Sequence, residues 1–383
     1  MTIIYLYRSL AAFGGVERIF IDKANYLAEH YGYHVYIITW EQGGHSIVYP
    51  LSPKVTHVDW GILFYRQYQY GLFKRMFMQW KMEKEFFKKL SNFVHTTQAD
   101  IVIGASCEFT TMAGMDLLQR KTHTILETHS MRTSIEKNNP PAGNLLMRWA
   151  FKRRDKQLHQ YIKHMSAFVT LTHNDAKDWS DITPQARIIP NMLHRYPAEI
   201  SPDKKTQKRI ITAGRLVEQK GYDLLLDAWS KVHQKHPEWI LDIYGEGEDK
   251  TMLLEKRKNL ALENSVLFHP PTLDIYQKYM DSDFYVMSSR FEGFGLVLAE
   301  AMSCGIPCVS FDCPHGPSDI IKDYEDGLLV EKENIKELAD KICYLIENEN
   351  VRIKMGHKAR ENVKRFLPEN VMKKWKNLFE SLT

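Results

Sequence analysis

The sequence predicts an α/β protein made of two doubly wound domains, each with a parallel β-sheet covered by helices. Short apolar segments alternate with helical stretches in both halves of the chain, which is the pattern of parallel strands buried on both faces. The two halves are separated by a stretch without periodicity, residues 194–208. The length of 383 residues, with 44% hydrophobic composition, is enough to bury two cores.

Ten strands are expected from these apolar segments. They are residues 3–7, 35–39, 101–104, 124–126 and 168–172 in the first half, and 209–213, 240–244, 266–268, 284–287 and 307–311 in the second. In doubly wound sheets the ligands bind outside the carboxyl ends of the strands, so functional residues are expected in the loops that follow them. We expect domains at 1–195 and 209–365, a linker at 196–208 and a terminal helix at 366–383.

The composition excludes several classes of protein. No apolar run approaches the roughly 20 residues that a membrane-spanning helix needs, and residues 1–10 are strand-like rather than signal-like, so a cytoplasmic protein is expected. The five cysteines include Cys304, Cys308 and Cys313, whose spacing fits no common zinc motif. They are interpreted as small buried residues.

The positive charge is concentrated in the first half of the chain. Residues 1–195 hold 24 Lys and Arg against 16 Asp and Glu, a net charge of +8, whereas the whole chain carries +4. No nucleic-acid-binding signature is present, so nucleic acid is not expected as a partner. Basic residues lie among large aromatics in 72–90, predicted as one amphipathic helix, and again in 151–164. These segments predict either contact with an anionic membrane surface, on its inner face, or a solvated helix face over the core, and both interpretations stay open.

The densest chemical motif is residues 290–305. Glu292 and Glu300 lie eight positions apart around a turn with two glycines, Gly293 and Gly295, before a helix expected to begin near Phe294. Glycines let the backbone approach a ligand closely, and the amino end of a helix attracts an anion. The motif therefore predicts a site for an anionic ligand such as a diphosphate.

A second motif supplies positive charge. Residues 210–221 read as a strand, a glycine turn, and then Arg215 and Lys220 before another helix. An arginine offers a bidentate fork and a lysine a mobile point charge, which together suit a diphosphate.

Taken together, Arg215, Lys220, Glu292 and, after seven residues, Glu300 resemble the retaining glycosyltransferases of the GT-B fold, specifically the large family four, or glycosyl transferases group 1. The resemblance covers nearly the whole chain. Further features occur in the family's order, namely Gly14-Gly15 before Val16-Glu17-Arg18, His129 after a strand, Ile189-Pro190-Asn191 before the linker, and Gly245-Glu246-Gly247 after a strand.

The resemblance implies an acceptor-binding domain at 1–195 and a nucleotide-sugar-binding domain at 209–365, facing each other across a cleft, with the terminal helix crossing back to the first. It implies that Arg215 and Lys220 hold the diphosphate, Glu300 the ribose hydroxyls and Glu292 the transferred sugar, with His129 beside that sugar. The implied catalytic residues are Glu292, His129, Arg215 and Lys220. The implied donor-binding residues are Gly14, Gly15, Arg215, Lys220, Glu292, Gly293, Phe294, Gly295, Leu296 and Glu300.

The implied reaction moves a hexose or N-acetylhexosamine from a nucleotide-diphosphate sugar to a saccharide, free or lipid-linked, with retention of configuration. The segment 314–321 resembles members that use UDP-sugars, which favours UDP. No metal or other cofactor is expected, because Arg and Lys supply the positive charge and because Asp283, in the Asp281-Ser282-Asp283 segment, leads directly into a buried strand. Two alternatives stay open, a GT-B-like epimerase or phosphorylase and a non-catalytic protein that binds nucleotide-sugars in membrane assembly.

Overall fold

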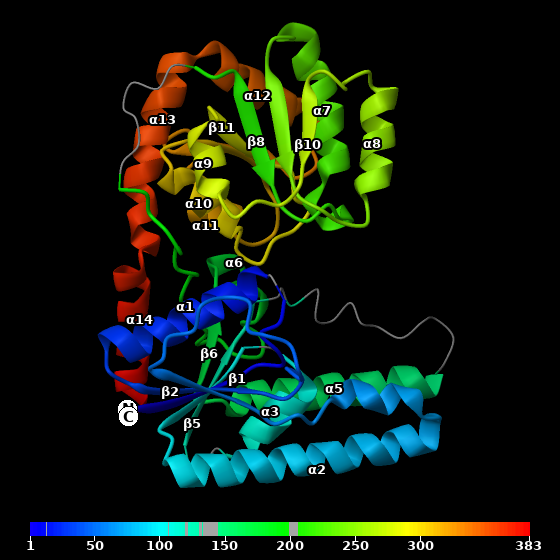
Figure 1. Ribbon diagram of the computed structural model, residues 1–383, viewed down its shortest axis with the longest axis vertical. Helices are drawn as coiled ribbons and strands as arrows, with labels where there is room; N and C mark the ends of the chain where they lie inside the picture. The colour runs from blue at the N-terminus through cyan, green and yellow to red at the C-terminus, as the bar shows by residue number, and fades with distance from the viewer. Residues whose placement is uncertain (13, 106, 119–121, 130–131, 133–144, 199–205) are drawn as a thin grey trace. The chain divides into compact units, whose positions relative to one another are not determined.

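The computed structural model describes residues 1–383 except 13, 106, 119–121, 130–131, 133–144 and 199–205. Contacts between Cα atoms divide the chain into two units (Figure 1). Unit 1 holds Met1–Pro190 with Val371–Thr383, and unit 2 holds Asn191–Asn370. Residues 191–195, expected at the end of the first domain, thus belong to the second unit, and the last helix belongs with the amino-terminal residues. Part of the expected linker, 199–205, lies outside the described residues.

Unit 1 is built on a seven-stranded parallel sheet with the strand order β3-β2-β1-β4-β5-β6-β7. Its strands are β1 Thr2–Leu6, β2 His34–Thr39, β3 Val55–Asp59, β4 Ile101–Gly104, β5 His123–Glu127, β6 Ala167–Thr170 and β7 Arg187–Ile188. Its helices are α1 Gly15–His30, α2 Leu72–Thr97, α3 Phe109–Asp116, α5 Leu145–His164, α6 His173–Asp178 and α14 Pro368–Leu382, with a 3-10 turn, η1, at Phe64–Gln69.

Unit 2 contains a six-stranded parallel sheet with the order β10-β9-β8-β11-β12-β13. Its strands are β8 Arg209–Ala213, β9 Ile240–Tyr244, β10 Val266–His269, β11 Phe284–Met287, β12 Cys308–Asp312 and β13 Gly327–Glu331. Its helices are α7 Tyr222–Lys235, α8 Lys250–Asn259, α9 Ile275–Met280, α10 Leu296–Ser303, α11 Pro317–Ile320, α12 Ile335–Glu347 and α13 Glu349–Asn362, with 3-10 turns η2 Glu218–Lys220 and η3 Val363–Phe366.

The predicted fold class is confirmed, since both sheets are parallel and all ten predicted strands are present within two residues of their expected ends. Three strands were missed, namely β3, β7 and β13. Each lies at an edge of its sheet, where one side is open and a continuous apolar run is not required. β7 is also only two residues long.

Each sheet is buried by apolar side chains from its helices. In unit 2 the core lies between the sheet and helices α7 and α12 and includes Trp229, Leu225 and Phe284, all fully buried. In unit 1 the core beneath α2, α3 and α5 includes Phe86 and Trp179. The interpretation of the cysteines as small buried residues is confirmed for Cys304, Cys308 and Cys313, which are at most 4% exposed.

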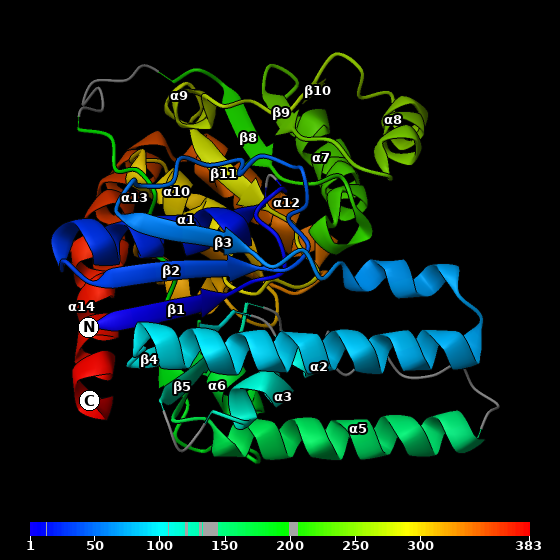
Figure 2. The ribbon, with the colours of Figure 1, turned by 60° about the horizontal axis from the view of Figure 1, so that its bottom comes forward.

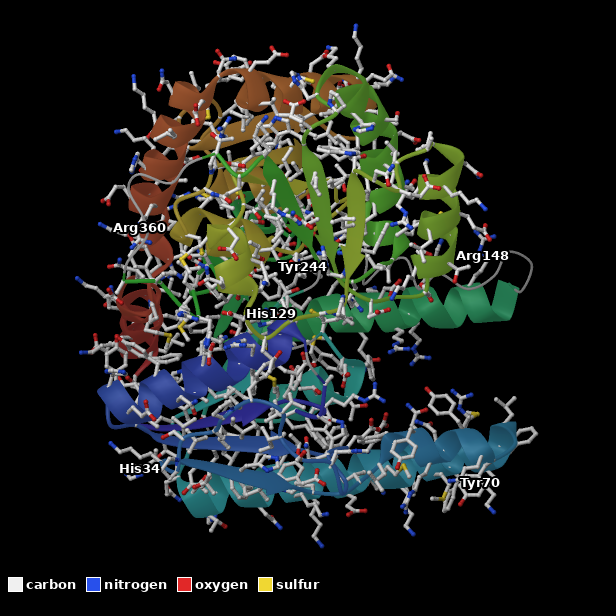
Figure 3. All side chains as sticks on the ribbon, turned by 45° about the horizontal axis from the view of Figure 1, so that its top comes forward. His34, Tyr70, His129, Arg148, Tyr244 and Arg360 are labelled. Atoms are coloured by element: carbon white, nitrogen blue, oxygen red, sulfur yellow. The ribbon has the colours of Figure 1, made fainter. Side chains whose placement is uncertain are left out.

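Helix α2 is longer than predicted, because Leu72–Thr97 replaces the expected 72–90. Its second half packs on the sheet through Met82, Phe86, Leu90 and Val94. Its first half, together with the start of α5, projects beyond the sheet (Figure 2), and Figure 3 labels Tyr70 and Arg148 at these ends. None of the helices within the described ranges is long and apolar enough to cross a membrane.

Candidate active site

The two charged motifs of unit 2 follow neighbouring strands. β8 and β11 pair in parallel, with Phe284 opposite Ile210 and Tyr285 opposite Ile211. They are also the strands at which the order of the sheet reverses, because β9 and β10 lie on one side and β12 and β13 on the other. Ligands of doubly wound sheets bind at this switch point, outside the carboxyl ends of the strands. The loops 214–221 and 288–295 begin there and form the candidate site.

The first loop presents two cations in different states. Arg215 is exposed and forms no ion pair with any residue in the described ranges. Lys220 is 17% exposed, and its Nζ lies 2.7 Å from Oε1 of Glu292 in the second loop. The residue predicted to bind the diphosphate and the residue predicted to bind the sugar are thus hydrogen-bonded to each other.

Glu292 is buried, with 6% of its surface exposed. Besides Lys220, its Oε1 accepts a hydrogen bond of 2.6 Å from the Ser289 hydroxyl. A buried carboxylate is stable only when it is paired and hydrogen-bonded, and these two donors supply that. Ser289 was not predicted, because a serine three residues before a glutamate gives no distinct signal in the sequence.

The second loop leads into α10, which begins at Leu296 rather than near Phe294. Gly295 is the residue before the helix and has a left-handed conformation, φ 86°, which ends the loop sharply. The backbone N–H groups of Gly293, Phe294 and Gly295 do not bond to another described group. They lie beside the positive end of the α10 dipole, which is the arrangement that binds an anion.

Two side chains of this segment have partners elsewhere in unit 2. The ring of Phe294 is buried and meets Phe366 edge to face at 5.4 Å between centroids. Glu300, on α10, is half-buried, and its Oε2 accepts a bond of 3.5 Å from the hydroxyl of Tyr279. The contact of Tyr279 was also not predicted from the sequence, because Tyr279 lies 21 residues before Glu300.

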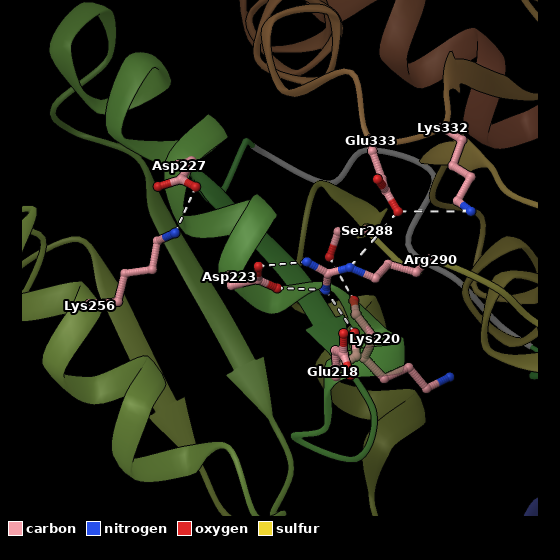
Figure 4. A network of polar contacts seen from close by, with 9 residues as sticks. All are labelled: Glu218, Lys220, Asp223, Asp227, Lys256, Ser288, Arg290, Lys332 and Glu333. Carbon is pink, nitrogen blue, oxygen red and sulfur yellow. Dashed lines mark hydrogen bonds and ion pairs between the residues drawn. The ribbon is translucent and has the colours of Figure 1, made fainter. Parts of the chain in front are cut away.

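Several contacts lock the two loops together. The Arg290 guanidinium donates to both carboxylate oxygens of Asp223 at 2.7 and 2.8 Å and to the Glu218 carbonyl at 2.8 Å (Figure 4). The Arg290 backbone N–H donates to the Gln219 carbonyl at 2.8 Å, and the Ser288 hydroxyl donates to the Lys220 carbonyl at 3.0 Å. The position of Lys220 is therefore set by the loop that carries Glu292.

A third loop supports the first from behind. A Cβ atom on Gly245 would lie 1.9 Å from the Gly214 carbonyl oxygen, and one on Gly247 would lie 2.2 Å from that of Leu216. The Leu216 N–H donates to the Glu246 carbonyl at 2.8 Å. The glycines of the 245–247 motif thus allow close packing between backbones.

The remaining predicted residues belong to unit 1. Gly14 precedes α1 and is crowded, because a Cβ there would lie 2.1 Å from Oε2 of Glu17, whereas Gly15 has open space. His129 follows β5, and its ring is buried, with Nε2 2.8 Å from Oε1 of Glu127. The structure groups Arg215, Lys220 and the residues from Glu292 to Glu300 at one edge of unit 2, and it places Gly14, Gly15 and His129 in the other unit.

The opposite edge of the unit 2 sheet, where strands begin, has different chemistry. The Asp283 carboxylate accepts hydrogen bonds from the backbone N–H groups of Gln207 and Arg209 at 3.0 Å each, so it caps the start of β8. A hollow of about 1010 Å³ lies beside Asp283 and Pro307, at the end of the sheet remote from Lys220.

One cluster of potential metal ligands is found among the residues that the structure describes. It consists of His236, Cys343 and Glu347, at the ends of α7 and α12. None of the three belongs to the loops at the switch point.

Known proteins are similar to this chain in sequence and in structure. The profile of the family described as Glycosyl transferases group 1 matches residues 198–362. An uncharacterized glycosyltransferase of Haemophilus influenzae is 29% identical over 384 residues, covering 98% of each chain. The amylovoran biosynthesis glycosyltransferase AmsD of Erwinia amylovora is 37% identical over 188 residues, 49% of this chain and 52% of AmsD. The structure of TarM from S. aureus, solved with Fondaparinux, alpha-GlcNAc-glycerol and UDP, has a TM-score of 0.74 at 18% identity and covers 99% of each chain.

Two parallel α/β sheets with a cationic loop and a glutamate-glycine loop at the switch point of the second define a glycosyltransferase of the GT-B fold. The matched region, 198–362, covers both loops of the candidate site. Residues 198–362 thus match the glycosyl transferases group 1, and the chain is a glycosyltransferase.

Proposed function

We propose that this enzyme transfers a hexose or N-acetylhexosamine from a UDP-sugar to a saccharide acceptor, with retention of configuration, in the synthesis of a polysaccharide or other glycan. One observation carries the proposal. Arg215, Lys220 and the free N–H groups of residues 293–295 lie in adjacent loops at the carboxyl edge of β8 and β11. Cations and N–H groups in this arrangement suit a diphosphate.

The charges of the site suggest how the leaving group departs. Arg215, which is exposed, and Lys220 bind the diphosphate oxygens, with each charge-assisted contact contributing roughly 1.5–3 kcal/mol. As Lys220 turns to the phosphate, Glu292 is released to accept hydrogen bonds from hydroxyls of the transferred sugar. Glu300 is assigned to the ribose hydroxyls. Charge that develops on the leaving phosphate is stabilised by the two cations and the α10 dipole.

The choice of UDP as the donor nucleotide and the retention of configuration are supported by observations other than the geometry of the site. TarM was solved with UDP, and the 314–321 segment resembles members that use UDP-sugars. Retention follows from the resemblance to family four. The acceptor hydroxyl attacks from the side of the leaving phosphate, which takes its proton. The anomeric configuration of the product, read by NMR, tests retention, and a trapped covalent glycosyl-enzyme would contradict front-face attack.

The donor assignment is tested by thermal unfolding with a panel of nucleotides and nucleotide-sugars. A ligand that binds only the folded protein stabilises it by about 2.7 kcal/mol at a hundredfold excess over Kd. UDP and UDP-sugars should raise the Tm of the wild type, and Glu300→Ala should lose most of this rise. Glu255→Ala, on helix α8 of the same unit, serves as the matched control and should keep it. If no nucleotide raises the Tm, the donor assignment fails.

Metal-independent catalysis is proposed because the site itself supplies cations. Activity should persist after divalent cations are removed by a chelator, since Arg215 and Lys220 act where a metal would. Abolition of turnover by the chelator, with recovery on adding Mg²⁺ or Mn²⁺, would show that the assignment of the cations is incomplete.

A lipid-linked acceptor and peripheral attachment to the inner face of a membrane are proposed from the projecting part of unit 1. Seven of the twelve exposed large hydrophobic side chains among the described residues fall within 65–80, and they include Phe73 at 87%, Phe77 at 59% and Trp80 at 50% exposure. Lys74, Lys81, Lys84 and Lys88 are exposed on the same helix, and α5 adds 152–154. Apolar rings among cations match an anionic interface.

Flotation with anionic and neutral liposomes at physiological salt tests this attachment. The wild type should float with anionic vesicles only. The triple variant Phe73→Ser, Phe77→Ser, Trp80→Ser should stay at the bottom while its nucleotide-induced rise in Tm is unchanged. Absence of wild-type binding to anionic vesicles would end the membrane proposal.

A further inference from the structure

Three ionisable side chains are buried together at the carboxyl end of β5 in unit 1. Glu127 is the last residue of that strand and is 1% exposed, Lys23 on α1 is 3% exposed, and the side chain of His129 is 5% exposed. Burying a charge is costly unless it is paired, and apolar residues of similar volume would often be at least as stabilising. Such a cluster therefore points to a role beyond holding the fold.

The contacts of Glu127 join the other two residues. Its carboxylate accepts a bond of 2.5 Å from Nζ of Lys23, which also contacts the second oxygen, and its Oε1 lies 2.8 Å from Nε2 of His129. Lys23 is enclosed by two aromatic rings, at 4.7 Å from the centroid of Trp375 on α14 and 5.8 Å from that of Tyr5 on β1. The ammonium group is thus fixed from three sides.

The charge state of Glu127 follows from these contacts. Burial by itself would raise its pKa, but Lys23 and His129 outweigh burial and lower the pKa to about 2. The carboxylate is therefore ionised at neutral pH and can only accept hydrogen bonds. It follows that Nε2 of His129 carries a hydrogen and that, in the neutral ring, Nδ1 is the acceptor.

We propose that Glu127 and Lys23 are positioning residues for His129: Glu127 holds the ring by Nε2 and directs Nδ1 toward substrate, and Lys23 fixes the Glu127 carboxylate and offsets its charge. This inference rests on the proposed function and on the family resemblance, which implies that His129 lies beside the transferred sugar. Without Lys23 the carboxylate would favour the imidazolium form, in which both nitrogens donate and neither can accept from a hydroxyl.

Two tyrosines in the described part of the chain also lie near this cluster. Tyr5 on β1 and Tyr7 just after it lie within reach of the Glu127 charge, and burial, followed by nearby carboxylates, raises the pKa of both above 10. Both stay neutral in the range where a histidine titrates. Changes in the titration of His129 are therefore expected to report on Lys23 and Glu127.

The test is the ¹⁵N NMR titration of His129 in the full-length protein, assigned with His129→Asn. Its pKa should rise in Lys23→Met, fall in Glu127→Gln, and lie between wild type and Glu127→Gln in the double variant. An opposite charge at this distance changes a pKa by about 1 to 3. Lys88→Met, at an exposed position on α2, is the control and should change nothing. If His129 titrates alike in all folded variants, or in a different order, the inference is overturned.

The double variant keeps the test usable if Lys23→Met alone does not fold, because it removes both buried charges at once. A kinetic measurement then separates this inference from the proposed function. The acid limb of the kcat profile against pH should move in the same order as the NMR pKa values, with the nucleotide-induced rise in Tm retained. If a variant binds UDP and its kcat profile against pH is that of the wild type, the positioning role is contradicted. If the wild type itself does not bind UDP, the donor assignment is contradicted.

Discussion

Replacing Arg290 with methionine should separate the two loops of the donor site. The substitution keeps the apolar stem of the side chain and removes three hydrogen bonds of 2.7–2.8 Å, two to Asp223 and one to the Glu218 carbonyl, and a longer ion pair of 3.9 Å with Glu333. Hydrogen bonds to charged groups contribute about 1.5–3 kcal/mol each when buried, and exposed ion pairs at most about 1 kcal/mol. Because the Arg290 side chain is 21% exposed, we expect a combined loss of about 2–3 kcal/mol.

The loss should appear in stability and in donor binding together. For a unit of this size, about 2–3 kcal/mol corresponds to a fall in Tm of roughly 4–12 °C. The Arg290 backbone bonds to Gln219, next to Lys220, so a displaced segment also moves the cation away from the diphosphate. We expect UDP to bind about tenfold more weakly, or about 1.4 kcal/mol, measured by calorimetry.

Helix α7 offers a matched control one turn further on. Lys256 pairs with Asp227 through one contact of 2.6 Å, at 27% and 32% exposure respectively, and this pair touches neither loop (Figure 4). Lys256→Met should cost at most about 1 kcal/mol and leave UDP affinity unchanged. Equal losses of Tm in the two variants, or wild-type UDP binding by Arg290→Met, would refute the view that Arg290 braces the site.

Two further predictions concern backbone space and buried charge. Gly221→Ala should lower the free energy of unfolding by about 2 kcal/mol or more and weaken UDP binding, since φ is 61° and the new Cβ would lie 2.0 Å from the Ser288 carbonyl oxygen. Gly71→Ala is the control, because Gly71 has open space and φ −62°. Equal effects of the two substitutions in urea denaturation would contradict the packing argument. Burial, with the charge of Asp178 second, raises the pKa of Asp175 from 3.8 to about 7. Asp175 ionises at a lower pH in the unfolded chain than in the folded protein. Its contribution to the free energy of unfolding is therefore complete below pH 3.8, declines as the pH rises to about 7 and then stays level. Asp175→Asn should abolish this decline between pH 4 and 7, and a slope equal to that of the wild type would disprove it.

The fold class and the location of the donor loops were determined by local sequence patterns. Buried parallel strands such as Phe284–Met287 have continuous apolar runs, and the glycines and charges that follow them stand out in any reading of the chain. Helix ends were less certain. The sequence suggested a start near Phe294, and only the left-handed conformation of Gly295 places it at Leu296.

Tertiary structure alone decided which distant residues meet. The contacts of Arg290 with Asp223, of Tyr279 with Glu300 and of Lys23 with Glu127 join residues 67, 21 and 104 positions apart. No periodicity links such positions, because the parallel crossovers between strands determine which residues become neighbours. The sequence therefore determined which groups of this glycosyltransferase are proposed to carry the chemistry, whereas the packing of its strands and helices determined which groups hold them in place.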